Sequence, residues 1–189
     1  MKLLEEKIKK HGEIIGGSVL KVDSFLNHQL DINLFNEMGK EFKRLFEKDN
    51  ITKIFTIETS GIAIASLAAL HFDVPVLFAK KHAGSNMDED CYEANVYSYT
   101  KNKSYIIKAS KRYLSSDDRV LIIDDFLASG SAVKGMIQIV RDAGAHVAGV
   151  GIAIEKGFES GRATIEDLGV RVESLAIIAS LEDNRIIFK

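Results

Sequence analysis

Short apolar runs alternate with segments of helical periodicity along most of this chain, and this alternation limits its possible folds more than any other feature. Four runs are rich in Val, Ile or Phe and have the length of buried strands: "TKIFTI", "VPVLFA", "RVLIID" and "HVAGVGIAIEK". Neighbouring parallel strands need a long crossover, which is usually a helix. The pattern therefore predicts an α/β protein with a central, mostly parallel sheet flanked by helices on both faces.

The expected helices are placed by their apolar faces. A short amphipathic helix is expected over residues 3–10, a second after a cap at Asp31 or Asn33, and a third over "IAIASLAALHF". The helix after "RVLIID" should end at Gly144. The stripe of the second helix consists of Phe35, Met38, Phe42, Leu45 and Phe46, and that of the last of Val133, Met136, Ile137 and Val140.

The remaining segments are expected around this framework. "EANVYSYTKNKSYIIKAS" should form two strands around the polar turn "TKNK", and "RVESLAIIASL" and "RIIFK" should be strands as well. The segment 80–90 is almost devoid of apolar residues, which indicates a mobile loop. We interpret the polar insert between residues 80 and 115 as a hood or lid, and we expect a single domain over residues 1–189.

Composition and charge limit the class of function. Of 189 residues, 46% are apolar and 28% charged, and a net charge of -2 gives no electrostatic footprint for nucleic acid or an anionic membrane. No apolar run is long enough to span a bilayer, and "MKLLEEKIKKHGE" lacks the apolar core of a secretory signal. The single cysteine, Cys91, excludes an internal disulfide, and the scattered histidines show no metal-ligand spacing. These features favour a soluble, cytoplasmic protein.

The stretch "VLIIDDFLASGSAVKG", residues 120–135, carries the clearest chemical signal. Two carboxylates, Asp124 and Asp125, follow a buried strand, and a loop over residues 127–132 opens a helix. In open α/β sheets, ligands bind beyond the carboxyl ends of the strands. The free amides at a helix N-terminus hold phosphate well. We therefore expect a binding site at this end of the strand.

The loop suits a phosphate, whereas the acids suit a sugar. Gly130 permits close backbone approach, and Ser129 and Ser131 add hydroxyl donors. Ionised carboxylates only accept hydrogen bonds, so the aspartates would bind the hydroxyls of a ribose, and a Mg²⁺ ion nearby would offset further negative charge. The pattern predicts a ribose 5-phosphate as ligand. The alternative is an acid pair that merely caps the following helix.

These residues resemble the type I phosphoribosyltransferases. "VLIIDDFLASGSA" has the order of their phosphoribosyl-pyrophosphate motif: four apolar residues, two acids, a spacer, then Thr or Ser, Gly, any residue and usually Thr. "LKVDSFLNHQ", "ITKIFTIETSGIA", "VYSYTK" and "AIEKGFESGR" extend the resemblance over essentially the whole chain, to the bacterial xanthine-using members. It implies the type I phosphoribosyltransferase fold, with a small hood built from residues 1–30 and the C-terminal segment. The segment 86–105 matches the flexible loop hairpin that closes over the active site.

The resemblance also implies an activity and partners. Such enzymes transfer the phosphoribosyl group of 5-phospho-α-D-ribose 1-diphosphate (phosphoribosyl pyrophosphate, PRPP) to xanthine and release XMP and pyrophosphate, as part of purine salvage. Mg²⁺ is held mainly by the substrate, and the resemblance suggests a homodimer. The alternatives are guanine, hypoxanthine or another purine as acceptor, or a non-catalytic regulator that binds PRPP.

The site residues implied by the resemblance fall into four groups. Catalytic residues would be Asp124 and Asp125. The 5-phosphate would be held by Ala128, Ser129, Gly130, Ser131 and Ala132. The pyrophosphate loop would be Thr59, Ser60 and Gly61, for which spacing alone fits an ordinary helix cap equally well. The base would be bound by Leu20, Asn27, Lys156 and Phe158.

Chemistry adds detail to some of these assignments. The ammonium of Lys156 is a donor only, so it suits the 6-oxo group of a purine and disfavours the 6-amino group of adenine. Phe158 would stack on the base or pack in the core. Lys80 and Lys81 follow a strand, where they would hold pyrophosphate or lie solvated on the surface.

Two alanines depart from the family pattern. Ala132 stands where many relatives have a phosphate-binding Thr, so backbone amides must contribute more. Ala128 stands where hypoxanthine-guanine enzymes carry an acid proposed as general base. Either another group takes the proton of the base, or the purine is acidic enough to lose it, as xanthine is.

Overall fold

One six-stranded sheet forms the middle of the molecule. The computed structural model describes residues 1–17, 19–81, 88, 90–98, 102–182 and 185–189. In this part of the chain the strands lie in the order β10, β9, β8, β7, β3, β4, and β10 at one edge runs antiparallel to its neighbour while the rest are parallel. The bounds are β3 Lys53–Ile57, β4 Val76–Ala79, β7 Arg119–Leu127, β8 His146–Lys156, β9 Val172–Ser180 and β10 Ile187–Phe188. The predicted mostly parallel sheet is confirmed.

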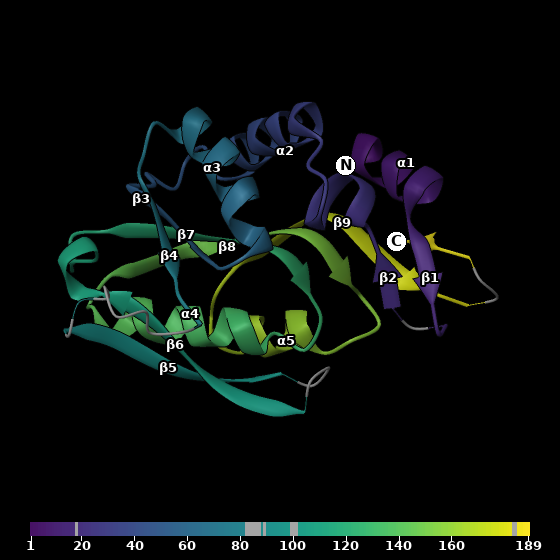
Figure 1. Ribbon diagram of the computed structural model, residues 1–189. Helices are drawn as coiled ribbons and strands as arrows, with labels where there is room; N and C mark the ends of the chain where they lie inside the picture. The colour runs from purple at the N-terminus through teal and green to yellow at the C-terminus, as the bar shows by residue number, and fades with distance from the viewer. Residues whose placement is uncertain (18, 82–87, 89, 99–101, 183–184) are drawn as a thin grey trace.

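Helices cover both faces of this sheet. Figure 1 shows α2 and α3 over one face, with α1 towards its end, and α4 and α5 against the other. Their bounds are α1 Lys2–His11, α2 Ile32–Leu45, α3 Ser60–Phe72, α4 Ser131–Asp142 and α5 Gly161–Glu166. The two-sided arrangement agrees with the α/β prediction. Within the described residues, no helix is long and apolar enough to cross a membrane.

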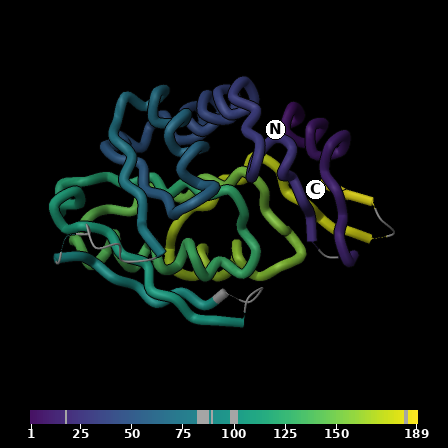
Figure 2. The backbone as a smooth tube through the Cα atoms, viewed as in Figure 1, coloured from purple at the N-terminus to yellow at the C-terminus, as the bar shows by residue number. Residues whose placement is uncertain are grey.

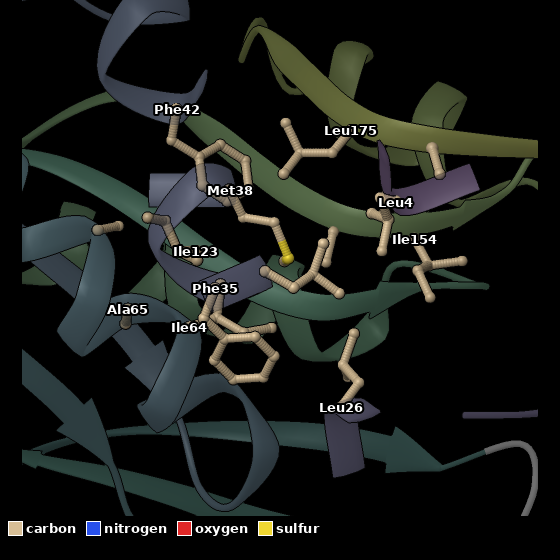
Figure 3. Close-up of a cluster of buried hydrophobic side chains, with 14 of the residues drawn as sticks. Leu4, Leu26, Phe35, Met38, Phe42, Ile64, Ala65, Ile123, Ile154 and Leu175 are labelled. Carbon is tan, nitrogen blue, oxygen red and sulfur yellow. The ribbon is translucent and has the colours of Figure 1, made fainter. Parts of the chain in front are cut away.

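Each face of the sheet has its own hydrophobic core, because side chains of a strand alternate between the two faces. On one side Phe42 of α2 and Ile64 of α3 belong to the same buried cluster as Ile123 of β7, which Figure 3 shows in close-up. On the other side Met136 of α4 belongs to a cluster with Ile122, the preceding residue of β7. The middle of β7 is therefore packed on both faces of the sheet.

The start of α2 is fixed by a side-chain cap. Asp31 is the N-cap, and its Oδ1 accepts a hydrogen bond from the backbone N–H of Leu34 at 3.1 Å, whereas Asn33 lies inside the helix. Lys7 of α1 donates to the other carboxylate oxygen at 2.7 Å. These bonds, that from Lys7 first, lower the pKa of Asp31. Of the predicted stripe, Phe35, Met38, Phe42 and Phe46 are buried and Leu45 is half-buried.

Two glycines of β8 make room for the rings of the α2 segment. A Cβ on Gly149 would lie 2.5 Å from Phe46 Cε1, and one on Gly151 would lie 2.8 Å from Phe42 Cε1. Real Cβ atoms do not approach so closely, so "GVG" in this strand is a packing feature. This agrees with the absence of the third glycine that a dinucleotide-binding motif would require.

Residues 1–17 and 19–30 lie at one end of the sheet, together with the C-terminal strand (Figures 1 and 2). Here β1 Glu13–Ile15 and β2 Val19–Lys21 form an antiparallel hairpin, followed by a π-helical turn, Asp23–Asn27. The sequence interpretation missed β1. Its signal was "GG": Gly16 and Gly17 have φ of 58° and 73°, which side-chain-bearing residues rarely adopt.

The polar insert contains a hairpin that packs on α4. β5 Cys91–Ser98 and β6 Lys103–Ser110 are antiparallel, as predicted, and a 3-10 helix, Lys111–Tyr113, follows. A Cβ on Gly135 of α4 would lie only 2.7 Å from Val96 Cγ2, so the hairpin approaches this helix closely. The predicted mobile loop over residues 80–90 and the turn "TKNK" lie mostly outside the described residues.

Candidate active site

Three parallel strands end side by side and present their loops at one edge of the sheet. The loop after β3 leads into α3, the loop after β7 into α4, and the loop after β8 into α5. Ligands of such sheets bind at this edge, because the helix N-termini and loops converge there. The predicted pyrophosphate residues lie on the first of these connections, β3–α3, and the predicted phosphate residues on the second, β7–α4, while Lys156 and Phe158 of the base-binding set lie at the third, β8–α5.

The acid pair lies inside β7, and in this respect the predicted boundary was wrong. The strand was expected to stop at Asp124 and the loop to run over residues 127–132. β7 instead continues to Leu127, because it pairs with β8 as far as Glu155. The loop is shorter, and Ser131 and Ala132 belong to the first turn of α4.

The two carboxylates differ in environment. Asp124 is only 5% exposed, whereas Asp125 is half-buried. Burial raises the pKa of Asp124 well above its ordinary value, the charge of Asp125 raises it further, and Lys81 opposes the shift. Each carboxylate accepts a hydrogen bond from the next backbone amide, that of Asp125 or Phe126, at 3.0 Å. The α4 N-terminus has no side-chain cap, so the alternative role as a helix cap is not realised.

The predicted phosphate loop is opened by a glycine in the left-handed region. Gly130 is the N-cap of α4 with φ 83°, and its carbonyl accepts from the amide of Lys134 at 2.8 Å. Ser129 donates to Ser131 through their hydroxyls at 3.3 Å. Residues 128, 129, 131 and 132 are half-buried. The structure thus gathers the predicted phosphate residues at one helix N-terminus beside the acid pair.

The predicted pyrophosphate loop is linked to the end of β4. The peptide between Glu58 and Thr59 is cis, and the carboxylate of Glu58 accepts a hydrogen bond from the backbone N–H of Lys81. α3 begins without a side-chain cap bond from Thr59, so the alternative of an ordinary cap is not realised here. Lys80 exchanges two backbone hydrogen bonds with Lys108 of β6, at 2.9 and 3.0 Å.

Gly61 of this loop approaches Asp124. A Cβ on Gly61 would lie 2.3 Å from Thr56 Oγ1 and 3.1 Å from Asp124 Oδ1. Thr56 is fully buried, and its hydroxyl has no hydrogen-bond partner among the described residues. Only glycine therefore fits between the strand and the acid pair without a displacement.

Gly61→Ala is expected to destabilise the protein by about 1–3 kcal/mol, as overpacking does, although alanine would otherwise favour a helix. Adding Thr56→Ala removes the nearest atom and should restore part of the stability. Thermal unfolding of both variants and of Thr56→Ala alone measures this. An unchanged unfolding temperature for Gly61→Ala would contradict the close contact.

The predicted base-binding residues come from two regions. Lys156 ends β8, is 15% exposed, and its ammonium lies 3.3 Å from Glu159 Oε1. Phe158 is 47% exposed, so packing in the core is not its role. Leu20 is buried in the core cluster and Asn27 is exposed at the end of the π-helical turn. Among the described residues, the ion-pair partner of Lys156 is Glu159, whereas Leu20 and Asn27 lie on the N-terminal segment.

Sequence reasoning missed three residues of this region. Thr56 and Glu58 precede the pyrophosphate loop in the chain, and the ring of Tyr105 of β6 lies near Lys81, whose Nζ is 5.8 Å from the ring centroid. Burial, followed by the charge of Asp124, raises the pKa of Tyr105. No short sequence pattern marks these residues, because the fold brings them together from β3 and the inserted hairpin.

Asp124→Asn is expected to raise the unfolding temperature of the ligand-free protein at pH 7 by about 2–4 °C or more. Above the ordinary carboxyl pKa of 3.8, the folded state keeps a proton that the unfolded chain releases, so stability falls as pH rises towards the raised pKa. Asparagine does not ionise, so this loss of stability at neutral pH disappears, and its side-chain oxygen can still accept a hydrogen bond from the Asp125 amide. Melting curves at pH 3.5 and 7 test this, since a gain that is equal at both pH values would contradict it.

The comparisons with known proteins agree with this geometry. The phosphoribosyl transferase domain family matches residues 22–177, and the chain belongs to this family. It is 61% identical to the xanthine phosphoribosyltransferase of Clostridium novyi and 58% identical to xanthine phosphoribosyltransferase 1 of Clostridium perfringens, over the full length of both partners in each case.

Solved structures show the same fold at low sequence identity. The adenine phosphoribosyltransferase of Rhodothermus marinus is 22% identical with a TM-score of 0.76, covering 94% of this chain and 100% of that one. The enzyme of Trypanosoma brucei, solved with AMP, pyrophosphate and ribose-5-phosphate, is 16% identical with a TM-score of 0.77, covering 92% of this chain and 78% of that one. The type I phosphoribosyltransferase fold is thereby confirmed.

Proposed function

We propose that this protein is a xanthine phosphoribosyltransferase of purine salvage, which transfers the phosphoribosyl group of PRPP to xanthine and gives XMP and pyrophosphate. One observation carries the proposal. An acid pair, of which Asp124 is buried, and a glycine-opened helix lie at one sheet edge, in a chain similar over its whole length to xanthine phosphoribosyltransferases.

The chain's own residues would act mainly by binding and orientation. The amides of residues 128–132 would hold the 5-phosphate, and Asp124 and Asp125 would hold the ribose hydroxyls. As pyrophosphate leaves, the anomeric carbon gains positive charge, and a carboxylate of Asp125 nearby would stabilise it. The loop with Thr59, Ser60 and Gly61 would bind the departing pyrophosphate. Positioning of the two substrates would supply much of the rate.

The base would be bound between the C-terminal end of β8 and the N-terminal segment. The ammonium of Lys156 would donate to the 6-oxo group, Phe158 would stack on the ring, and Asn27 and Leu20 would contact the base from the hood. The N-terminal segment touches the C-terminal one, since a Cβ on Gly12 would lie 3.1 Å from Leu20 Cδ1 and 3.4 Å from Ile186 Cδ1. This contact supports a hood built from both ends of a single domain, residues 1–189.

Mg²⁺ fits the chemistry of the donor set. Carboxylate oxygens such as those of Asp124 and Asp125 are the hard ligands that this ion takes. Bound together with PRPP, it would neutralise charge on the diphosphate. Most of its ligands would come from the substrate.

A homodimer in the cytoplasm is proposed from the family resemblance. Exposed apolar side chains on α3 and β4, Leu70 at 74% and Phe78 at 37%, support an association surface. Sedimentation equilibrium would measure the oligomeric state, and a monomer at micromolar concentration would contradict the dimer.

The proposed activity is tested by incubation with PRPP, Mg²⁺ and one purine at a time. XMP and pyrophosphate should appear with xanthine at the highest kcat/KM. A preference for guanine or hypoxanthine would reassign the acceptor base. Tight binding of PRPP with no release of pyrophosphate would instead identify a regulator.

A further inference from the structure

A buried ion pair that the proposed mechanism does not use lies behind the phosphate loop. The side chain of Glu155, in β8, is only 3% exposed. Arg162 of α5 donates to both of its carboxylate oxygens, Nε to Oε1 at 2.9 Å and Nη2 to Oε2 at 2.6 Å. Ser174 of β9 donates to Oε2 as well. This two-pronged geometry fixes direction as well as distance.

Arg162 also donates hydrogen bonds to two further groups. Nη1 donates to the carbonyl of Val172 at 2.9 Å and to Glu166 Oε1 at 3.2 Å. Burial alone would raise the pKa of Glu155, but hydrogen bonds from Arg162 and Ser174 more than offset it and the pKa is lowered. The pair is therefore charged at neutral pH and ties α5 to two strands of the sheet.

The residue before Arg162 touches the phosphate loop directly. A Cβ on Gly161 would lie 2.2 Å from the carbonyl oxygen of Ala128 and 2.9 Å from Leu127 Cγ. From the other side, a Cβ on Gly130 would lie 3.1 Å from the carbonyl oxygen of Gly161. The backbones of α5 and the loop are thus in contact with no side chain between them.

Sheet register places the ion pair next to the start of this loop. Leu127, the last residue of β7, is paired with Glu155 of β8. Arg162 therefore anchors α5 to Glu155, the residue of β8 that is paired with the last residue of β7 before the loop. Any shift of α5 would be passed directly to residues 128–130, because the contact is between backbones.

We propose that Glu155 and Arg162 are a positioning pair for the phosphate-binding loop. They hold α5 at the separation at which its backbone supports residues 128–130, so that the amides at the start of α4 meet the phosphate. A buried ion pair contributes little net stability compared with apolar side chains of the same volume. The contribution of this ion pair is therefore to fix the position of the phosphate-binding loop.

The pair acts on the phosphate rather than on the base. Successive side chains of a strand point to opposite faces, so Lys156 points away from the side on which Glu155 meets Arg162. The ammonium of Lys156 is instead paired with Glu159. The inference rests on the proposed function only for the identity of the ligand, a sugar 5-phosphate.

The test is Arg162→Lys, which keeps the charge and loses the two-pronged bond. The affinity for ribose 5-phosphate, measured by titration calorimetry, is expected to fall about 10-fold, since small misplacements of a binding group have large effects. The KM for xanthine should stay within about twofold. The matched control is Arg44→Lys. Arg44 donates to both carboxylate oxygens of Glu41 on an exposed helix face, from Nε at 2.9 Å and from Nη2 at 2.7 Å. This substitution should change neither value.

The outcomes separate this inference from the proposed function. An unchanged affinity for ribose 5-phosphate in folded Arg162→Lys overturns the inference, and so does an equal loss for sugar phosphate and xanthine. If Arg162→Lys does not fold, Glu155→Gln, which keeps the shape of the side chain, is measured by the same criteria. If the unaltered protein binds ribose 5-phosphate but makes no XMP, the proposed function fails while the calorimetric comparison still decides the role of the pair.

Discussion

Asp125→Asn is expected to lower kcat by about 10²–10³-fold with the fold intact, the range found when one electrostatic stabiliser of a transition state is removed. Asn keeps the shape of the side chain and can still accept a bond from the Phe126 amide through its oxygen, as Asp125 does at 3.0 Å. It removes the negative charge that would face the developing positive charge on the ribose. Steady-state turnover of xanthine and PRPP measures the change.

Two further variants sharpen this result. Asp142→Asn replaces an exposed aspartate at the far end of α4 and should leave kcat unchanged. Asp124→Asn should also lower activity, yet it should stabilise the ligand-free protein at pH 7, so its two effects have opposite signs. Full turnover by Asp125→Asn would reject its role at the ribose.

Lys156→Ala is expected to weaken the use of 6-oxopurines by about 1–3 kcal/mol in kcat/KM, the cost of a lost hydrogen bond to a charged group. The donor is well placed for such a role, since it lies at the end of β8 and is 15% exposed. Its partner Glu159 is 33% exposed and can return to water, so the fold should not suffer. Comparing xanthine, hypoxanthine and adenine as acceptors measures the specificity.

The control for this variant is Lys40→Ala. Lys40 forms the same kind of pair three residues apart, with Glu37 at 2.7 Å, on the exposed face of α2. It should behave as the unaltered protein does. A loss in Lys156→Ala that is equal for every base, adenine included, would refute a role in selecting the 6-oxo group.

Most of the fold follows from local sequence patterns. The strands with the strongest apolar runs and the helices with one apolar face were placed correctly. Apolar residues spaced for one face of a helix, or gathered in a short run, indicate which type of element buries them. β8 matches its predicted bounds, whereas β7 runs three residues further than expected. Pairing with a longer neighbour keeps β7 extended through two acids that would otherwise end a strand, and no pattern local to β7 reveals this.

The candidate site was predictable only in part. The acid pair and Gly130 lie on one short stretch with a shared chemical meaning, so the sequence suffices to single them out. Thr56, Tyr105 and the pair Glu155–Arg162 come from separate elements and meet only in three dimensions. The roles proposed for Leu20 and Asn27 depended on resemblance, since a lone leucine or asparagine carries no spacing from which binding can be inferred. Lys156 offered a further signal, because it is a donor at the end of a predicted strand.

The contact between Gly161 and the carbonyl of Ala128 limits how this protein can change. A clash at Gly61 falls on the side chain of Thr56, so a second substitution can relieve it. A clash at Gly161 falls on the main chain, which every amino acid at position 128 shares. No replacement at position 128 can therefore relieve that clash, and a change of acceptor base would have to come from the base-binding residues while this junction stays as it is.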